Sequence, residues 1–518
     1  MTDELVEFVL EQTSRPLDRW AVAATLESRG IRDVDARERF GRRDVFDLAD
    51  DVYARCLEAE LPEAPKTMRL HSRNQRTLAV AGRFLRGGFF FVQLALQFGS
   101  LALLGYGQWA SLAFTGRQAS IIGVALLASF LIAGAFVQAL GYLGPYFAAP
   151  GKYRLVWRVA AAVVVLAIGG LAVGALVAWL VNLFSRSYDD HSLVTGLVYY
   201  MLAGCVAIAG GVLYMLKQYV AMLVCTAAGI AVVGIVLHHT ALGIYGAHWL
   251  GLGTTSVAEG LWAAALLARR ARGTTAEMRG AQLPPRPVLV AAAVPYALYG
   301  AGYFALVFAD RLAAWSTHSH GFPFTFRSGY EVGLDWALIS VVPALAMLEV
   351  TIHAFSARLE SAGTSHLAEA SGEHNGELLR FYRRHLGIVA LLIVAGASAT
   401  FGLGRLVITL RLTKLHSLFS SSTTLHVYPI AVVGYAFLVW GLFNGLFLFS
   451  LGRPWLVVRA LLPAVVVAVT IAVALAHTLV YWAAAGGFVA GTLVFALGAS
   501  ASTRRVLSSV DYYYAAAY

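Results

Sequence analysis

Residues 159–184, VAAAVVVLAIGGLAVGALVAWLVNLF, form an uncharged apolar stretch long enough to cross a lipid bilayer. A helix needs about 20 such residues to span a hydrocarbon core about 30 Å thick. Similar stretches recur along the 518-residue chain, which is 59% hydrophobic and only 13% charged. Soluble domains carry roughly 25% charged residues. The composition therefore predicts an all-α polytopic membrane protein.

The apolar stretches predict about twelve membrane-spanning helices. A basic, proline-containing linker at 269–286 separates a first bundle of six helices in 87–268 from a second bundle of six in 287–500. Residues 501–518 are expected to form a cytoplasmic tail. The individual spans are expected near 87–109, 119–147, 156–184, 194–216, 218–238, 247–268, 287–309, 335–356, 386–404, 426–450, 454–476 and 479–500.

Lysine and arginine residues are distributed unevenly between the loops. When alternate loops are assigned to opposite sides of the membrane, one side holds 23 basic residues and the other holds 7. Cytoplasmic loops carry the excess of basic residues in membrane proteins, so both termini are predicted to lie in the cytoplasm. The cluster of Arg405, Arg411 and Lys414 fits this orientation poorly. Orientation explains the basic charge, and nucleic-acid binding is not predicted.

Residues 1–65 have the opposite charge, with 16 acidic and 9 basic residues. Apolar residues recur at helical spacing, Gly30 follows one predicted helix as a left-handed cap would, and Asp44 stands in an N-cap position. We expect a small acidic cytoplasmic helical domain at 1–65, followed by a basic linker at 66–86. It is either an accessory or folding domain, or a docking surface for a cytoplasmic partner.

Few ionisable residues fall within the predicted spans. In VFADRLAAW (307–315), Asp310 and Arg311 end the seventh span. Neighbouring residues on a helix do not face one another, so each needs another partner, for which Arg327 and Asp335 are candidates. These four residues form either an outer gate or an interfacial anchor.

Two glutamates are candidates for a polar cavity. Glu349 follows Pro343 in the eighth span, and the proline is expected to kink that helix because it removes a backbone hydrogen bond. Glu259 lies late in the sixth span. Charged groups inside a bilayer usually face a cavity or a partner, so both side chains are expected to line a lumen as polar contacts or proton sites.

The predicted outer loop STHSHGFPFTFRSGYEVG (316–333) is rich in aromatic residues. They are candidates for stacking on sugars, although aromatic residues also concentrate at the membrane interface. The two histidines lack a third ligand, so no metal site is predicted. Phosphate-loop, metalloprotease and nucleophile-elbow motifs are missing from the sequence, so neither an enzyme nor a cofactor is expected. The candidate stacking residues are Phe322, Phe324, Phe326 and Tyr330.

Three stretches carry a family resemblance: FADRLAAW (308–315), GYEVGLDWALISVVPALAMLEVTIHAF (329–355) and GLFNGLFLFSLGRPWLVVRALL (441–462). They resemble the membrane subunit of the Pel exopolysaccharide transporter family (PelG-like). Asp310, Arg311, Pro343 and Glu349 fall on matching positions, although Arg311 stands where the family has lysine. The first membrane half matches poorly, and the acidic N-terminal domain replaces the family's short basic opening.

The resemblance implies the MOP flippase superfamily, which includes MATE exporters and has two six-helix bundles around a central cavity. It implies a protein of the bacterial cytoplasmic membrane that exports or flips a polysaccharide or lipid-linked oligosaccharide by alternating access. Three alternatives stay open: a MATE-like small-molecule or cation antiporter, a membrane polymerase or glycosyltransferase, and a scaffold that holds a cytoplasmic glycosyltransferase. The implied partners are the lipid bilayer, the sugar substrate and such a glycosyltransferase.

Overall fold

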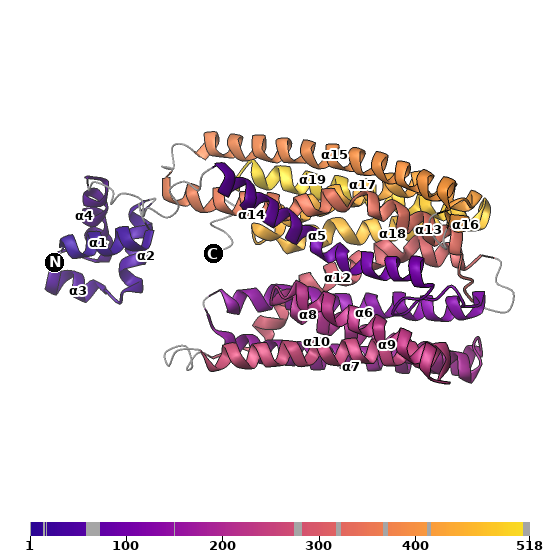
Figure 1. The fold of residues 1–518 in the computed structure, drawn as a ribbon. Helices are drawn as coiled ribbons and strands as arrows, with labels where there is room; N and C mark the ends of the chain where they lie inside the picture. The colour runs from indigo at the N-terminus through magenta and orange to yellow at the C-terminus, as the bar shows by residue number, and fades with distance from the viewer. Residues whose placement is uncertain are drawn as a thin grey trace.

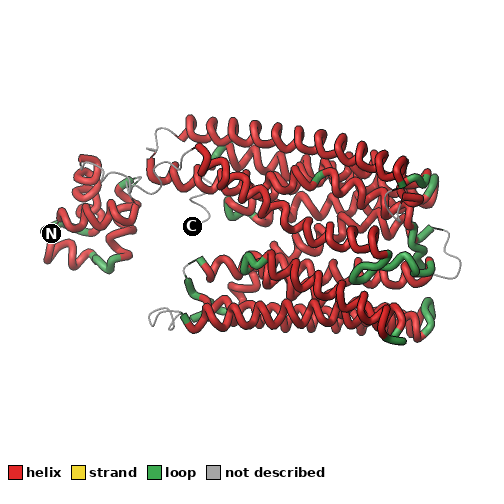
Figure 2. Tube along the Cα trace, in the orientation of Figure 1, coloured by secondary structure: helices red, strands yellow, loops and turns green. Residues whose placement is uncertain are grey.

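A computed structural model of the chain describes residues 2–13, 16, 18–58, 73–149, 151–273, 282–317, 323–365, 371–411 and 416–510. Within these ranges the secondary structure is helical and contains no β-strand (Figure 2). Four short helices form a separate unit at the N-terminus, and longer helices make up most of the rest (Figure 1). The prediction of an all-α protein is confirmed.

The N-terminal unit has its own apolar core. Val9, Leu26 and Leu48 are at most 1% exposed and pack together in one cluster. The helix ends follow the predicted local chemistry: Asp47 N donates to Asp44 Oδ1 over 2.8 Å, and Gly30 has a left-handed φ of 87°. The Asp47 N–H also lowers the pKa of the Asp44 carboxyl. The helices are α1 (Thr2–Thr13), α2 (Arg19–Ser28), α3 (Asp33–Phe40) and α4 (Val45–Glu58).

We expect Leu48→Ala to lower the free energy of unfolding of an isolated 1–65 fragment by about 2–5 kcal/mol, because it leaves a cavity in this core. Urea unfolding followed by circular dichroism measures the change. Val34 is 52% exposed, so Val34→Ala is the matched control and should change stability by less than about 0.5 kcal/mol. A random-coil spectrum for the unaltered fragment would contradict the assignment of an independent domain.

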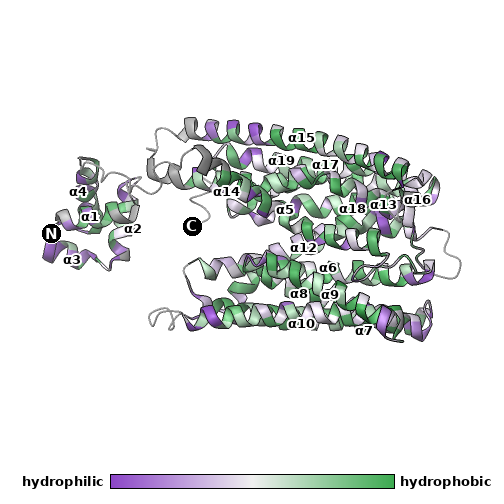
Figure 3. Cartoon of the chain, in the orientation of Figure 1, coloured by the Kyte–Doolittle hydropathy of each residue, from purple (hydrophilic) through white to green (hydrophobic). Residues whose placement is uncertain are grey.

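The remaining helices are apolar along most of their length (Figure 3). In the described residues, eleven spans are long and apolar enough to cross a membrane, and α5, bent by 52°, makes the twelfth. The predicted number of spans is confirmed. The first half contains α5 (Arg73–Leu104), α6 (Gly116–Ala148), α7 (Tyr153–Ser185), α8 (Asp190–Met215), α9 (Tyr219–His239) and α10 (Gly243–Arg272). The second contains α12 (Arg286–Trp315), α13 (Ser328–Ser340), α14 (Val342–Ser365), α15 (Ser371–Leu410), α16 (His416–Phe419), α17 (Ser422–Ser450), α18 (Pro454–Thr478), η2 (Tyr481–Ala484) and α19 (Ala485–Leu507).

The long helices form two lobes, α6–α10 and α13–α19, which we call the N-terminal and C-terminal lobes (Figure 1). The first helix of each half contacts both lobes: α12 packs against α6 and α18, and α5 packs against α14 and α9. This corrects the expectation that 87–268 packs as a bundle of its own. Gly87 permits the close approach of α5 to α14, because a Cβ there would lie 2.6 Å from Ala346 O.

Three predicted boundaries also change. Helix α5 begins at Arg73, inside the expected 66–86 linker, and α19 continues to Leu507, past the expected end at 500. The eighth span is broken: α13 ends at Ser340, and α14 begins at Val342, one residue before Pro343. Proline has no N–H to continue the helical ladder, which accounts for a break at this place.

The distribution of basic residues predicts which end of the lobes faces the cytoplasm. The end near the 269–286 linker is the predicted cytoplasmic end, and the opposite end, near the 316–327 segment, is the predicted outer end. We expect reporter fusions in 269–286 and after Arg505 to report the cytoplasm, and a fusion at His320 to report the outside. Paired alkaline phosphatase and fluorescent-protein fusions measure this. The same location for His320 and for the linker would overturn the assignment.

Candidate functional site

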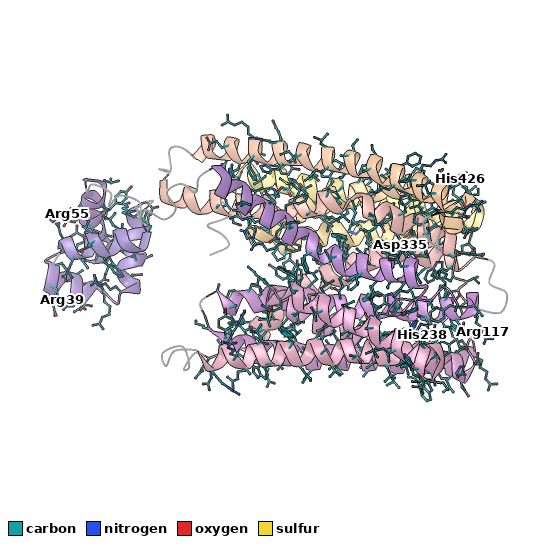
Figure 4. The ribbon with its side chains drawn as sticks, viewed as in Figure 1. Arg39, Arg55, Arg117, His238, Asp335 and His426 are labelled. Atoms are coloured by element: carbon teal, nitrogen blue, oxygen red, sulfur yellow. The ribbon has the colours of Figure 1, made fainter. Side chains whose placement is uncertain are left out.

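A buried group of charged side chains joins the end of α12 to α13. Arg311 Nη1 lies 3.2 Å from Glu331 Oε2, and Arg311 Nη2 lies 3.5 Å from Asp335 Oδ1. Glu331 and Asp335 are four residues apart and therefore share one face of α13. Asp335 lies inside the C-terminal lobe, in the part that holds α13 and α16 (Figure 4). Asp335 was a predicted partner, whereas Glu331 was not.

Asp310 is fully buried and has a different partner from the ones expected. Tyr330 Oη donates to Asp310 Oδ2 over 2.6 Å, and Asp310 Oδ1 has no hydrogen-bond donor. Arg327 is not its partner, because Arg327 Nη2 donates to Thr317 O over 2.9 Å and the guanidinium lies 4.8 Å from the ring centre of Tyr481. The 307–315 stretch thus holds two charges that face α13 through separate contacts.

In the described part of the chain, two carboxyl groups contact the Arg311 guanidinium, and the buried carboxyl of the neighbouring Asp310 adds a third acidic group that contacts Tyr330 instead. The Arg311 and Glu331 side chains are only 12% and 10% exposed, so their charges are largely removed from solvent. Trp315 Nε1 also donates to Glu331 Oε1 over 3.0 Å. Breaking such a buried group by removing one charge leaves the others uncompensated, which is costly. An excess of acid over base is a setting that favours a bound proton or cation.

No metal site accompanies this excess. Among the described residues, no group of three or more histidine, cysteine, aspartate or glutamate side chains is arranged to hold a metal ion.

Phe324 and Phe326 lie against the N-terminal lobe, at the end of the molecule that is predicted to be the outer one. Phe326 N donates to Ser120 Oγ of α6 over 2.8 Å, and Phe324 lines an apolar cavity of about 420 Å³ with residues of α6, α7 and α8. The expectation that Tyr330 belongs to an exposed stacking loop is wrong in this conformation, because Tyr330 is 0% exposed within α13. Phe322 lies outside the described residues.

Glu349 lies where α14 faces the N-terminal lobe. Its side chain is 36% exposed, and Glu349 Oε1 is 3.2 Å from His353 Nε2. It packs against α5, because a Cβ added at Gly87 would lie 2.8 Å from Glu349 Cβ. The residue therefore lies at the contact of α14 with α5, the helix that packs against both lobes.

Glu259 has a different environment from the one expected. It is 0% exposed, and neither carboxylate oxygen has a hydrogen-bond partner. A Cβ added at Gly210 of α8 would lie 3.3 Å from Glu259 Oε2, so the side chain is enclosed by helices of its own lobe. The expectation that it lines a cavity is therefore wrong for this conformation, because α8 packs directly over it.

A series of aromatic rings connects the lobes and was not predicted. Tyr142 of α6 stacks on Tyr296 of α12 with ring centres 4.1 Å apart, and Tyr296 stacks on Phe449 of α17 at 5.3 Å. Tyr299 and Tyr303 continue the series along α12. The spacing 296, 299, 303 places the three tyrosines on one face of a helix. This spacing is visible in the sequence and could have indicated the series.

No protein-family model matches the chain, and no curated protein matches it. Among solved structures it is similar to a multidrug resistance MATE family transporter of the MOP superfamily in an outward-facing conformation, with a TM-score of 0.55, 14% identity and coverage of 83% of this chain and 96% of that chain. It is also similar to a MOP superfamily transporter from Pyrococcus furiosus, with a TM-score of 0.51, 14% identity and coverage of 84% of this chain and 96% of that chain. That protein is described as having a binding pocket of reversed polarity, which suggests a different function. For a MATE protein in the straight conformation, the TM-score is 0.52 and the identity is 16%, with coverage of 84% of this chain and 96% of that chain. The predicted MATE-like fold is confirmed.

Proposed function

We propose that the chain is a transporter of the bacterial cytoplasmic membrane that exports or flips a polysaccharide or lipid-linked oligosaccharide by alternating access. The MATE-like fold supports transport, and the PelG-like stretches around Asp310 and Glu349 support a glycan substrate. In this proposal the substrate passes between the lobes, while the outer contacts open and the cytoplasmic ends close.

The observation that carries the glycan proposal is the series of tyrosines between the lobes. Tyrosine combines an apolar ring face with a hydroxyl group that donates and accepts hydrogen bonds. Sugars present apolar C–H faces and hydroxyl groups, so they match such side chains. Tyr142 and Tyr296 come from opposite sides of the α6–α12 contact, and both rings are partly exposed. Separation of α12 from α6 would free their stacked faces for a sugar.

A small-molecule or cation antiporter is the second candidate. Glu349 favours it, because one carboxylate between apolar helices is a usual contact for an organic cation. Glu349 also serves the glycan proposal, as a polar contact or a proton site. The buried Glu259 is proposed as a proton site that becomes accessible only in another conformation.

Transport by proteoliposomes distinguishes the two candidates. We expect Tyr142→Ala together with Tyr296→Ala to lower flipping of a fluorescent lipid-linked oligosaccharide at least tenfold. The matched control is Trp179→Ala, since Trp179 is 47% exposed on α7, and it should leave flipping unchanged. Efflux of an organic cation without any glycan flipping by the unaltered protein would contradict the glycan substrate and leave the antiporter.

A further inference from the structure

A basic groove lies between α15 and α19 at the cytoplasmic end of the C-terminal lobe. Its volume is about 820 Å³, and both helices contribute arginine side chains to it: Arg383 from α15, and Arg504 and Arg505 from the last turn of α19. The remaining lining residues are Leu379, Tyr382, Leu386, Gly387, Ala390 and Ser508.

The three arginines have no acidic partner in the part of the chain that the structure describes. The nearest ion pair along α15 joins Arg380 to Glu377 at 4.0 Å and leaves Arg383 out. Three exposed guanidinium groups that converge on one groove repel one another unless an anion lies between them. Guanidinium groups bind phosphate oxygens through paired hydrogen bonds. The groove is therefore suited to a phosphate group.

The wall of the groove is braced by buried polar contacts. Tyr382 Oη donates to Asn444 Oδ1 over 2.9 Å, and Asn444 Nδ2 donates to Ser500 Oγ over 3.0 Å. These bonds tie α15 to α17 and α19. The space beside Gly387 is open, because a Cβ at this position would meet no atom within 4 Å. Leu386 and Ala390 extend this surface toward the membrane interior.

The position of the groove indicates where its ligand comes from. Among the eleven described spans other than α5, α15 is the most exposed, with only 17% of its most apolar part buried, so it faces lipid. Its neighbours are α13, α14, α16, α17 and α19, all in the C-terminal lobe. The groove thus opens to the bilayer at the edge of the molecule, away from the contact between the lobes.

We propose that this groove binds an anionic phospholipid of the cytoplasmic leaflet. The three guanidinium groups hold the headgroup phosphate, and an acyl chain lies along Leu386, Gly387 and Ala390. Basic pockets between membrane helices on the cytoplasmic side hold anionic headgroups by this chemistry. The site is separate from the proposed transport path and does not depend on which solute is carried.

Native mass spectrometry of the full-length protein in detergent tests the site. Phosphatidylglycerol should bind more tightly than phosphatidylcholine with the same acyl chains. The variant Arg383→Gln/Arg504→Gln/Arg505→Gln should weaken phosphatidylglycerol binding by about a hundredfold, since each basic residue near an anionic lipid contributes about fivefold. The control Arg154→Gln/Arg158→Gln/Arg384→Gln loses the same charge from exposed arginines outside the groove and should bind normally.

Two further variants separate charge from shape. Gly387→Trp fills the groove without changing its charge and should also weaken binding, whereas replacing the three arginines with lysine keeps the charge without the paired hydrogen bonds and should retain part of the binding. Equal binding of the two lipids, or an equal loss in the control triple variant, would overturn the proposal. Displacement of the lipid by millimolar inorganic phosphate would identify a free-anion site and would overturn it as well.

Discussion

Arg311→Gln is expected to abolish transport while the amount of protein and its membrane insertion stay normal. Arg311 is the cation in the described cluster that faces Glu331 at 3.2 Å and Asp335 at 3.5 Å. Without it, largely buried carboxylates lose their counter-charge, at a cost of about 3–5 kcal/mol in the conformation that holds them together. Glycan flipping by proteoliposomes with matched protein amounts measures the effect.

The related variants separate a gate from an anchor. Arg311→Lys should retain part of the activity, because the charge stays but the forked contact to two carboxylates is lost. Asp310→Asn should also abolish transport, and the exchanged variant Asp310→Arg/Arg311→Asp should not restore it, because both side chains would then meet the wrong partners. Arg186 is an exposed residue of the predicted outer end, so Arg186→Gln is the matched control and should transport at a near-normal rate. Near-normal transport by Arg311→Gln would leave interfacial anchoring as its role.

The fold was predictable because membrane helices are specified by local sequence. Continuous apolar stretches identify each span, and Pro343 marks the break between α13 and α14. The start of α5 at Arg73 was not predicted, because the helix extends beyond its apolar residues and hydropathy identifies only the apolar part. The caps at Gly30 and Asp44 were predictable because they depend on residues a few positions away.

The contacts of the site were only partly predictable because they join distant segments. A partner for Arg311 was required by helix geometry, and Asp335 fulfils this requirement. Glu331 was not predicted as a partner of Arg311, because residues 316–333 were assigned to a loop. Its spacing of four residues from Asp335 nevertheless matches one helical turn. The burial of Glu259 follows from packing of α8 against α10, which the sequence of α10 does not contain.

A disulfide between Ser120→Cys and Phe326→Cys is expected to stop transport almost completely. Phe326 N lies 2.8 Å from Ser120 Oγ, which brings the 323–327 segment of the second half against α6 of the N-terminal lobe. Trp315 packs at the same place, since a Cβ at Gly123 would lie 2.8 Å from its ring. In the proposed alternating access this contact opens in each cycle, so a covalent bond across it would hold the predicted outer end closed. The variant is made in a chain from which Cys56, Cys205 and Cys225 have been removed.

Oxidation should reduce glycan flipping by more than about tenfold, and a reducing agent should restore it, because the native contact stays intact when the bond is absent. Each single-cysteine variant is the control and should respond to neither reagent. The result is informative in both directions. Reversible inhibition means that the outer contact between Ser120 and Phe326 must break during transport. Undiminished flipping with the disulfide fully formed means that the substrate crosses without separation of the outer ends, and a fixed scaffold or a path outside the lobes would then replace alternating access as the explanation.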